Sequence, residues 1–178
     1  ETLVQHPHTA GVTFTGSFDV GMRIYRSLAN GAYPKPCIAE MGGKNACIVT
    51  EHADLDAAAN GIVRSAFGLS GQKCSALSRL YVPEGDRARG YFVTPVIAEA
   101  PLSSPLWRQE LFLPILMLHR VATKQQAMAL ANDSDVGLTA GFYGSVAEIA
   151  WFHEHIEAGV TYANRAQGAT TGAWPGYQ

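Results

Sequence analysis

The segment GQKCSALSR, residues 71–79, places a single cysteine directly after a glycine, a glutamine and a lysine. A thiol acts as a nucleophile where it is accessible and its thiolate is favoured, and element boundaries with open backbone N–H groups supply both conditions. Cys74 follows an expected helix and the break at Gly71, so we expect it at such a boundary. The alternative is a small buried apolar residue, because an isolated cysteine is usually inert.

The remaining cysteines and the histidines give weaker signals. Cys37 and Cys47 lie inside apolar runs, and we assign them to packing. Three cysteines without metal-type spacing do not suggest a disulfide scaffold, which favours a reducing, cytoplasmic location. The histidines include two pairs spaced i, i+2, and residues two apart on a helix do not share a face. We therefore predict no metal site.

A carboxylate stands at the end of an apolar run in AEMGGKN, residues 39–45. Partial desolvation of Glu40 at that position would raise its pKa toward the range useful to a general base. The alternative is a glutamate at a strand end that points into solvent, which is the commoner situation for this residue type.

A junction that could bind phosphate occurs in GVTFTGS, residues 11–17, where an apolar strand runs into an expected helix. Gly16 and Ser17 at the helix N-terminus could present free N–H groups to an anion. Many α/β proteins have the same junction without a ligand, so the motif alone leaves both interpretations open.

Short apolar runs alternate with helical patterns along the chain, which predicts an α/β layer fold. The expected strands are residues 11–16, 37–41, 46–50, 79–82, 90–98, 111–121 and 159–164. The expected helices are residues 18–29, 54–69, 124–132 and 146–158. The second of these helices should bury one face, formed by Leu55, Ala58, Ile62, Ala66 and Leu69. Capping-box patterns, Thr123 with Gln126 and Ser145 with Glu148, open the last two helices.

Composition narrows the class of protein. The 178 residues are 47% hydrophobic and 16% charged, which indicates a globular protein with a substantial core. A net charge of −2 without a basic run argues against nucleic-acid binding. The longest apolar run has the length of a strand, so we expect no membrane span, and the first residues lack the pattern of a signal peptide.

Six segments occur in an order that resembles the aldehyde dehydrogenase superfamily: FTGS, EMGGKN, GQKCSALSR, QELFLPI, NDSDVGLTAGFYG and AGVTYAN. The resemblance runs over nearly the whole chain, from about Val12 onward. It implies an α/β fold with part of an NAD(P)-binding domain in residues 1–36 and an α/β catalytic domain in residues 37–164. Residues 165–178 would form a loop on the substrate side.

The resemblance also implies roles for individual residues. Cys74 matches the catalytic nucleophile and Glu40 the general base. The positions that match the dinucleotide contacts are Thr15, Gly16, Ser17, Glu110 and Phe112, with Ser17 at the pyrophosphate and the last two at the nicotinamide ribose and ring. Asn164 matches an asparagine near the active site. The implied cofactor is NAD, with NADP not excluded.

The implied reaction oxidises an aldehyde to a carboxylic acid through a cysteine thiohemiacetal and a thioester. The sequence most resembles the 1-pyrroline-5-carboxylate dehydrogenases, which oxidise glutamate semialdehyde in proline catabolism. In that subfamily Ser75, Gly172 and Ala173 would hold the substrate's α-carboxylate. The expected partner is a small aldehyde, and the full-length form is expected to be a homo-oligomer.

The sequence also departs from this family. The short polar link PEGDRAR, residues 83–89, stands where the family has a longer segment, so we expect an internal deletion there. Upstream strands with the oxyanion asparagine, and the later PFGG loop, are missing from the sequence. If this is the whole polypeptide, we expect no turnover. The alternatives are a non-catalytic remnant that assembles with a full-length partner, and a cysteine hydrolase that uses the same thiol without hydride transfer.

Overall fold

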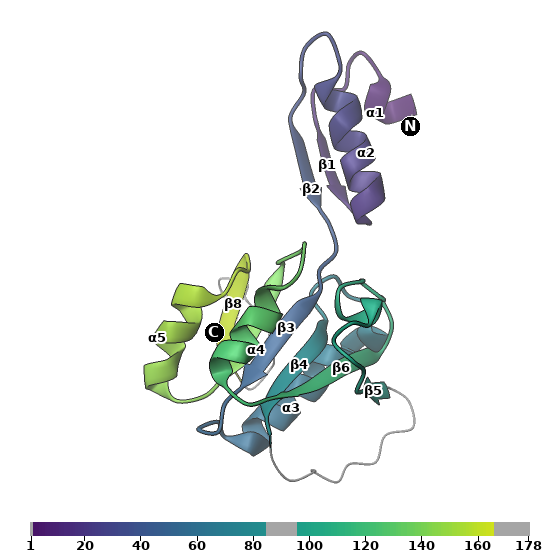
Figure 1. Ribbon diagram of the computed structural model, residues 1–178. Coiled ribbons are helices and arrows are strands. Elements are labelled where there is room, and N and C mark those ends of the chain that lie inside the picture. The colour runs from purple at the N-terminus through teal and green to yellow at the C-terminus, as the bar shows by residue number, and fades with distance from the viewer. Residues whose placement is uncertain (1, 85–95, 166–178) are drawn as a thin grey trace. The chain divides into compact units, whose positions relative to one another are not determined.

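The computed structural model describes residues 2–84 and 96–165. The chain divides into two compact units, Glu1–Gly42 and Gly43–Gln178 (Figure 1). The boundary expected from the sequence, between residues 36 and 37, falls before the second strand, whereas the units divide after it. That strand stays with the first unit because it pairs with the first strand of the chain.

The first unit consists of α1 (Thr2–Gln5), β1 (Val12–Thr15), α2 (Phe18–Ala29) and β2 (Cys37–Glu40). The two strands are parallel, with Val12 opposite Cys37 and Thr15 opposite Glu40. Burial alternates along both strands, as a sheet covered on one side requires. A Cβ at Gly21 in α2 would lie 3.4 Å from the Phe14 ring, which shows that α2 covers this face.

The second unit is a parallel six-stranded sheet with helices on both faces. Its strands are β3 (Asn45–Val49), β4 (Leu77–Pro83), β5 (Val96–Ala98), β6 (Ile115–Val121), β7 (Thr139–Tyr143) and β8 (Val160–Ala163). They lie in the order β5-β6-β4-β3-β7-β8. The helical segments are α3 (Leu55–Phe67), η1 (Gly68–Gly71), η2 (Pro105–Trp107), α4 (Lys124–Asn132) and α5 (Val146–His155).

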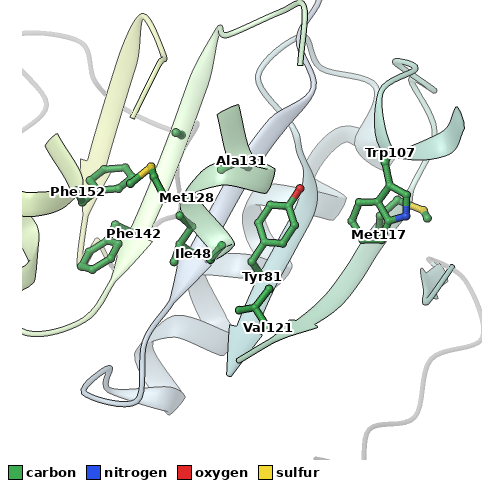
Figure 2. Packing of buried hydrophobic residues seen from close by; sticks show 12 residues of the cluster. Ile48, Tyr81, Trp107, Met117, Val121, Met128, Ala131, Phe142 and Phe152 are labelled. Carbon is green, nitrogen blue, oxygen red and sulfur yellow. The ribbon is translucent and has the colours of Figure 1, made fainter. Parts of the chain in front are cut away.

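The central strand β3 is buried on both faces, and its side chains alternate between two cores. Ala46 and Ile48 belong to the cluster beneath α4 and α5, which also holds Tyr81 and Trp107. Within this cluster the rings of Phe142 and Phe152 stack with their centroids 4.9 Å apart (Figure 2). Cys47 and Val49 belong to the cluster beneath α3.

The structure corrects the expected face of α3. Ala58, Ile62 and Ala66 pack into the core as predicted. The prediction was wrong for Leu55, which is 68% exposed in the first turn, and for Leu69, which is 73% exposed. The helix ends at Phe67, and Leu69 adopts a left-handed backbone, so the helical spacing does not extend to it.

Other boundaries also differ from the expected ones. The sixth strand begins only at Ile115, because Pro114 has no N–H to donate to the sheet. The last helix ends at His155, before Gly159. Of the strand expected over residues 90–98, only β5 is described, and the rest lies outside the described residues.

The Ser145–Glu148 capping box is confirmed. The Thr123 hydroxyl caps α4, but the Gln126 side chain accepts from the Ala122 N–H instead of completing the box.

Buried Arg79 connects β4 to the end of α4. Its guanidinium donates to the carbonyls of Leu130 at 3.0 Å and Ala131 at 2.9 Å, and its Nε donates to the Lys44 carbonyl at 2.8 Å. The last carbonyls of a helix lack intrahelical donors and form the negative end of its dipole. Arg79 therefore satisfies these carbonyls while they compensate its buried charge.

A second buried charge, Glu148, joins three elements where the sheet's strands end. Its carboxylate accepts from the Ser145 N–H at 3.0 Å and the Ser145 hydroxyl at 2.8 Å. It also accepts from the Thr50 hydroxyl at 3.0 Å and from Lys124 Nζ at 3.1 Å. Burial by itself would raise the pKa of Glu148, but these hydrogen bonds outweigh it and lower the pKa to about 2.

The Glu148 network should make the stability of the second unit depend on pH. A carboxylate whose pKa falls from 4.5 to about 2 on folding contributes stability that is complete above pH 4.5 and is lost as the pH falls toward 2. Glu148→Gln should lower the free energy of unfolding at pH 7 by about 2–3 kcal/mol, and the deficit should shrink as the pH falls. Denaturant titrations followed by the fluorescence of Trp107 and Trp151 would measure it.

Glu154→Gln, on an exposed position of the same helix, is the matched control and should change the free energy of unfolding little at any pH. Equal deficits in the two variants would contradict a stabilising role for the Glu148 carboxylate.

Candidate active site

Parallel pairing brings the segments that precede β3, β4, β6 and β7 to one edge of the second sheet. Cys74 lies in the turn before β4, and Glu110 and Phe112 lie in the loop before β6. A small pocket at this edge is lined by Gly43 and by residues from both segments, including Gly71, Glu110 and Phe112. The structure thus places the turn of Cys74 beside the loop of Glu110 and Phe112, although Cys74 itself is not among the residues that line the pocket.

Cys74 occupies the element boundary that the sequence predicts. It is half-buried between η1 and β4, and all three cysteines of the chain are free thiols. Cys47, by contrast, is buried in β3, and burial raises the pKa of its thiol well above the ordinary value. Cys37 is half-buried in β2. Of the two thiols in the second unit, Cys74 is the accessible one.

Three consecutive residues before the Cys74 turn have positive φ: Leu69 at 54°, Ser70 at 57° and Gly71 at 69°. Such a conformation is costly for residues with a side chain and persists where the surroundings impose it. The neighbouring loop lies directly against this segment, because a Cβ at Gly71 would lie 2.5 Å from the Leu113 carbonyl oxygen. The Cys74 turn and the Phe112 loop are therefore packed backbone against backbone.

The loop before β6 presents its two predicted cofactor contacts toward solvent. Phe112 is 50% exposed and has a positive φ of 53°. Glu110 is exposed, and its Oε1 accepts from the Gly43 N–H at 3.3 Å. An exposed ring and an exposed carboxylate on one loop have the chemistry to contact a nicotinamide ring and a ribose. This assignment stays a prediction.

A buried amine that the sequence analysis did not predict lies beneath this edge. Lys44 is 1% exposed, and within the described part of the chain its Nζ has no hydrogen-bond partner. Burial lowers the pKa of Lys44 to about 8, and nearby Arg79 lowers it as well, whereas Glu110 acts in the opposite direction. Nothing in the spacing of AEMGGKN distinguishes this lysine from an exposed one.

The first unit carries the predicted general base and the predicted pyrophosphate contacts. Glu40 is exposed at the end of β2, so the partial desolvation expected for it is absent from the structure. Thr15, Gly16 and Ser17 are exposed at the end of β1 and the start of α2. Among the described residues, the Ser17 side chain makes no capping hydrogen bond to α2. The open N–H groups of this helix fit the negative charge of a pyrophosphate.

The predicted substrate residues are only partly described. Ser75 is half-buried in the turn beside Cys74, and Gly172 and Ala173 lie outside the described residues. Asn164 follows the carboxyl end of β8, whereas Cys74 precedes β4 at the other edge of the sheet, and the expected position of Asn164 near the active site stays a prediction. Its amide donates to the Gly144 carbonyl at 2.8 Å and accepts from the Gly144 N–H at 3.0 Å, which is a structural role.

In residues 2–84 and 96–165, no group of three or more histidine, cysteine or acidic side chains is placed to hold a metal ion. In the same ranges, no helix has the length and apolar character needed to cross a membrane.

The chain belongs to the aldehyde dehydrogenase family, whose model matches residues 1–88 and 84–178. The 1-pyrroline-5-carboxylate dehydrogenase of Bacillus cytotoxicus is 32% identical over 242 aligned positions, covering 99% of this chain and 46% of that protein. The 1-pyrroline-5-carboxylate dehydrogenase from Thermus with bound NAD is 29% identical with a TM-score of 0.82, covering 92% of this chain and 44% of that one. An NAD-dependent aldehyde dehydrogenase from Sinorhizobium meliloti is 25% identical with a TM-score of 0.84, covering 96% and 45%.

The chain spans about half the length of the curated relatives it matches. The alignment with the Bacillus cytotoxicus protein contains 242 positions, more than the 178 residues of this chain, so that protein has residues without a counterpart here. The two segments of the chain that match the family model overlap at residues 84–88. The deletion predicted for residues 83–89 would include this junction, and it stays a prediction.

The contact between the two loops should make Gly71 sensitive to substitution. Gly71→Ala adds a Cβ at a left-handed position and 2.5 Å from the Leu113 oxygen, so it should lower the free energy of unfolding by about 1–3 kcal/mol. Denaturant titration would measure this change. Gly68→Ala is the control, because its Cβ would meet nothing within 4 Å and its φ is −55°. A loss of stability in Gly68→Ala as large as that in Gly71→Ala would contradict the loop contact.

Proposed function

We propose that this protein represents an NAD(P)-dependent aldehyde dehydrogenase that oxidises L-glutamate γ-semialdehyde to glutamate. The single observation that carries the proposal is the position of Cys74, an accessible thiol at the sheet edge that also presents Glu110 and Phe112. Membership of the family supports the reaction class, and the 1-pyrroline-5-carboxylate dehydrogenases among its relatives support the substrate.

In the first half of the proposed reaction, the Cys74 thiolate attacks the aldehyde carbon. A C–S bond forms, and the carbonyl π electrons move to oxygen to give a thiohemiacetal anion, which hydrogen-bond donors would stabilise. As the C=O bond re-forms, the hydride leaves the carbon and the product is a Cys74 thioester. The bound nicotinamide supplies the acceptor for that hydride.

In the second half, Glu40 takes a proton from a water molecule, whose oxygen attacks the thioester carbon. The C–S bond breaks, the Cys74 thiolate is regenerated, and the carboxylic acid leaves. The role of Glu40 rests on its match to the general base of the family, because the partial desolvation expected for it is absent at its exposed position at the end of β2.

The residues that would hold the dinucleotide fit its chemistry. The open N-terminus of α2, with Thr15, Gly16 and Ser17, would receive the pyrophosphate. Glu110 would accept from the nicotinamide ribose hydroxyls, and Phe112 would pack against the nicotinamide ring. The proposal includes two domains. Residues 1–36 would bind the dinucleotide, and residues 37–164 would form the catalytic domain.

The substrate's α-carboxylate would be held by Ser75 together with Gly172 and Ala173, because backbone N–H groups in a glycine loop receive carboxylates well. Ser75 lies next to Cys74 in the turn, which supports its part in this assignment. A cytoplasmic location and a homo-oligomeric full-length form complete the proposal.

The proposal is tested by following NADH formation at about 340 nm, the absorption band of the reduced cofactor, with glutamate semialdehyde as substrate. Cys74→Ala should reduce turnover to less than about one-thousandth of wild type, because no other group can form the thioester. Cys37→Ala, which removes a half-buried thiol from β2, is the control and should keep turnover within about twofold of wild type. Equal activity in wild type and Cys74→Ala would reject the mechanism.

A second candidate is a non-catalytic remnant that assembles with a full-length dehydrogenase. This candidate is favoured because the aligned relative has residues that have no counterpart in this chain. A natural protein with a mass near 19.1 kDa, no turnover and co-purification with a full-length dehydrogenase would support this candidate. A natural protein of much larger mass with turnover would reject it.

A further inference from the structure

Asn45, the first residue of β3, is buried beneath the turn that carries Cys74. Its Nδ2 donates to the Cys74 carbonyl at 2.8 Å and to the Ala76 carbonyl at 2.9 Å. Its Oδ1 accepts from the Thr139 N–H at 3.0 Å. One side chain therefore joins the amino ends of β3, β4 and β7 at the edge where the nucleophile lies.

The amide can make these bonds in one orientation only. An asparagine amide has two N–H donors and one oxygen acceptor, and here both donors face carbonyl oxygens while the oxygen faces an N–H. A rotated amide would place oxygen against oxygen and lose all three bonds. Because the side chain is 2% exposed, water cannot replace them at low cost.

The backbone ladder does not hold this part of β4 by itself. Asn45 pairs with Leu77 and Ala46 pairs with Arg79, so the register shifts by one residue and Ser78 is left as a bulge. Bulges interrupt the ladder and redirect the strand, and they are common beside active sites. Between the bulge and Cys74, the hydrogen bonds of the Asn45 side chain hold the chain to the sheet in place of the interrupted backbone pairing.

The direction of the Cys74 peptide group follows from these bonds. Because a trans peptide is planar, a Cys74 carbonyl that points at Asn45 makes the Ser75 N–H point away from it. Gly43 keeps this approach open, since a Cβ there would lie 2.7 Å from Asn45 Oδ1 and 3.1 Å from the Cys74 oxygen. The turn is thus held in a single orientation relative to the sheet.

We propose that Asn45 is the positioning residue of the nucleophile turn, and that its amide fixes the Cys74 backbone so that the thiol is aimed at the substrate carbon. The part of this inference that concerns the substrate rests on the proposed function. The attachment of the turn to the sheet does not depend on that function. A displacement of about 1 Å at the reacting atom can cost about a hundredfold in rate, so the loss of the attachment should act on kcat and leave binding nearly unchanged.

The test compares Asn45→Ala with Asn132→Ala. Asn132 is the matched control, because its amide also bridges two backbone groups, donating to the His155 carbonyl at 2.8 Å and accepting from the Glu157 N–H at 3.0 Å. Four quantities are measured at a temperature well below unfolding: kcat and KM for glutamate semialdehyde, the rate of Cys74 alkylation by iodoacetamide, and the rate of Cys47 alkylation. The two alkylation rates come from peptide mass spectrometry.

We expect kcat to fall about tenfold or more in Asn45→Ala with KM changed less than about twofold. Alkylation of Cys74 should become several-fold faster, because the freed turn opens, while buried Cys47 stays protected. Asn132→Ala should leave all four quantities near wild type. Asn45→Ser, which keeps one donor and leaves a smaller void, should give a smaller change in the same direction.

Unchanged kcat and unchanged Cys74 alkylation in Asn45→Ala would overturn the proposal. Alkylation of Cys47 that rises in step with Cys74 in both Asn45→Ala and Asn45→Ser would also overturn it, because the residue would then support the core as a whole. If wild type shows no turnover, the proposed function fails, and the alkylation rates alone decide whether Asn45 holds the turn.

Discussion

The candidate site depends on the parallel pairing of β3 with its two neighbours. Parallel strands begin at the same edge of a sheet, so the segments before β3, β4, β6 and β7 meet there although they are far apart in the chain. Three features of the site come from this one constraint: the turn of Cys74, the loop of Glu110 and Phe112, and the amide of Asn45. A slip in register by one residue would exchange the two cores of β3 and separate these groups.

Buried charges stabilise the two ends of the same sheet by different means. At the carboxyl ends of the strands, Glu148 accepts four hydrogen bonds, which keep it ionised in spite of burial. Near the amino ends, Arg79 is compensated by the last carbonyls of α4. Lys44 lies beside Arg79 without a hydrogen-bond partner among the described residues, so its positive charge is the least favourable of the three. The candidate site therefore lies above a buried ammonium whose charge has no hydrogen-bond partner among the described residues.

Backbone conformation adds a second constraint at this edge. The left-handed residues Leu69 and Ser70 and the positive φ of Phe112 occur on the two loops that touch through Gly71 and Leu113. Non-glycine residues in this region cost about 1–3 kcal/mol each and are retained where packing over-determines them. The two loops therefore fix one another, and the amide of Asn45 fixes the turn to the sheet.

The sequence by itself determined the α/β class, the described strands and α-helices other than β7 and the short α1, and the boundary position of Cys74, because these follow from local periodicity and from caps such as Ser145 with Glu148. It did not determine the exposure of Leu69 and Glu40, the place of Asn164, or the roles of Asn45 and Lys44. Those depend on which strands pair, in which register, and on which segments approach one another. Contacts between residues 45, 74 and 139 leave no trace in the spacing of a single chain, and only the tertiary structure brings them together.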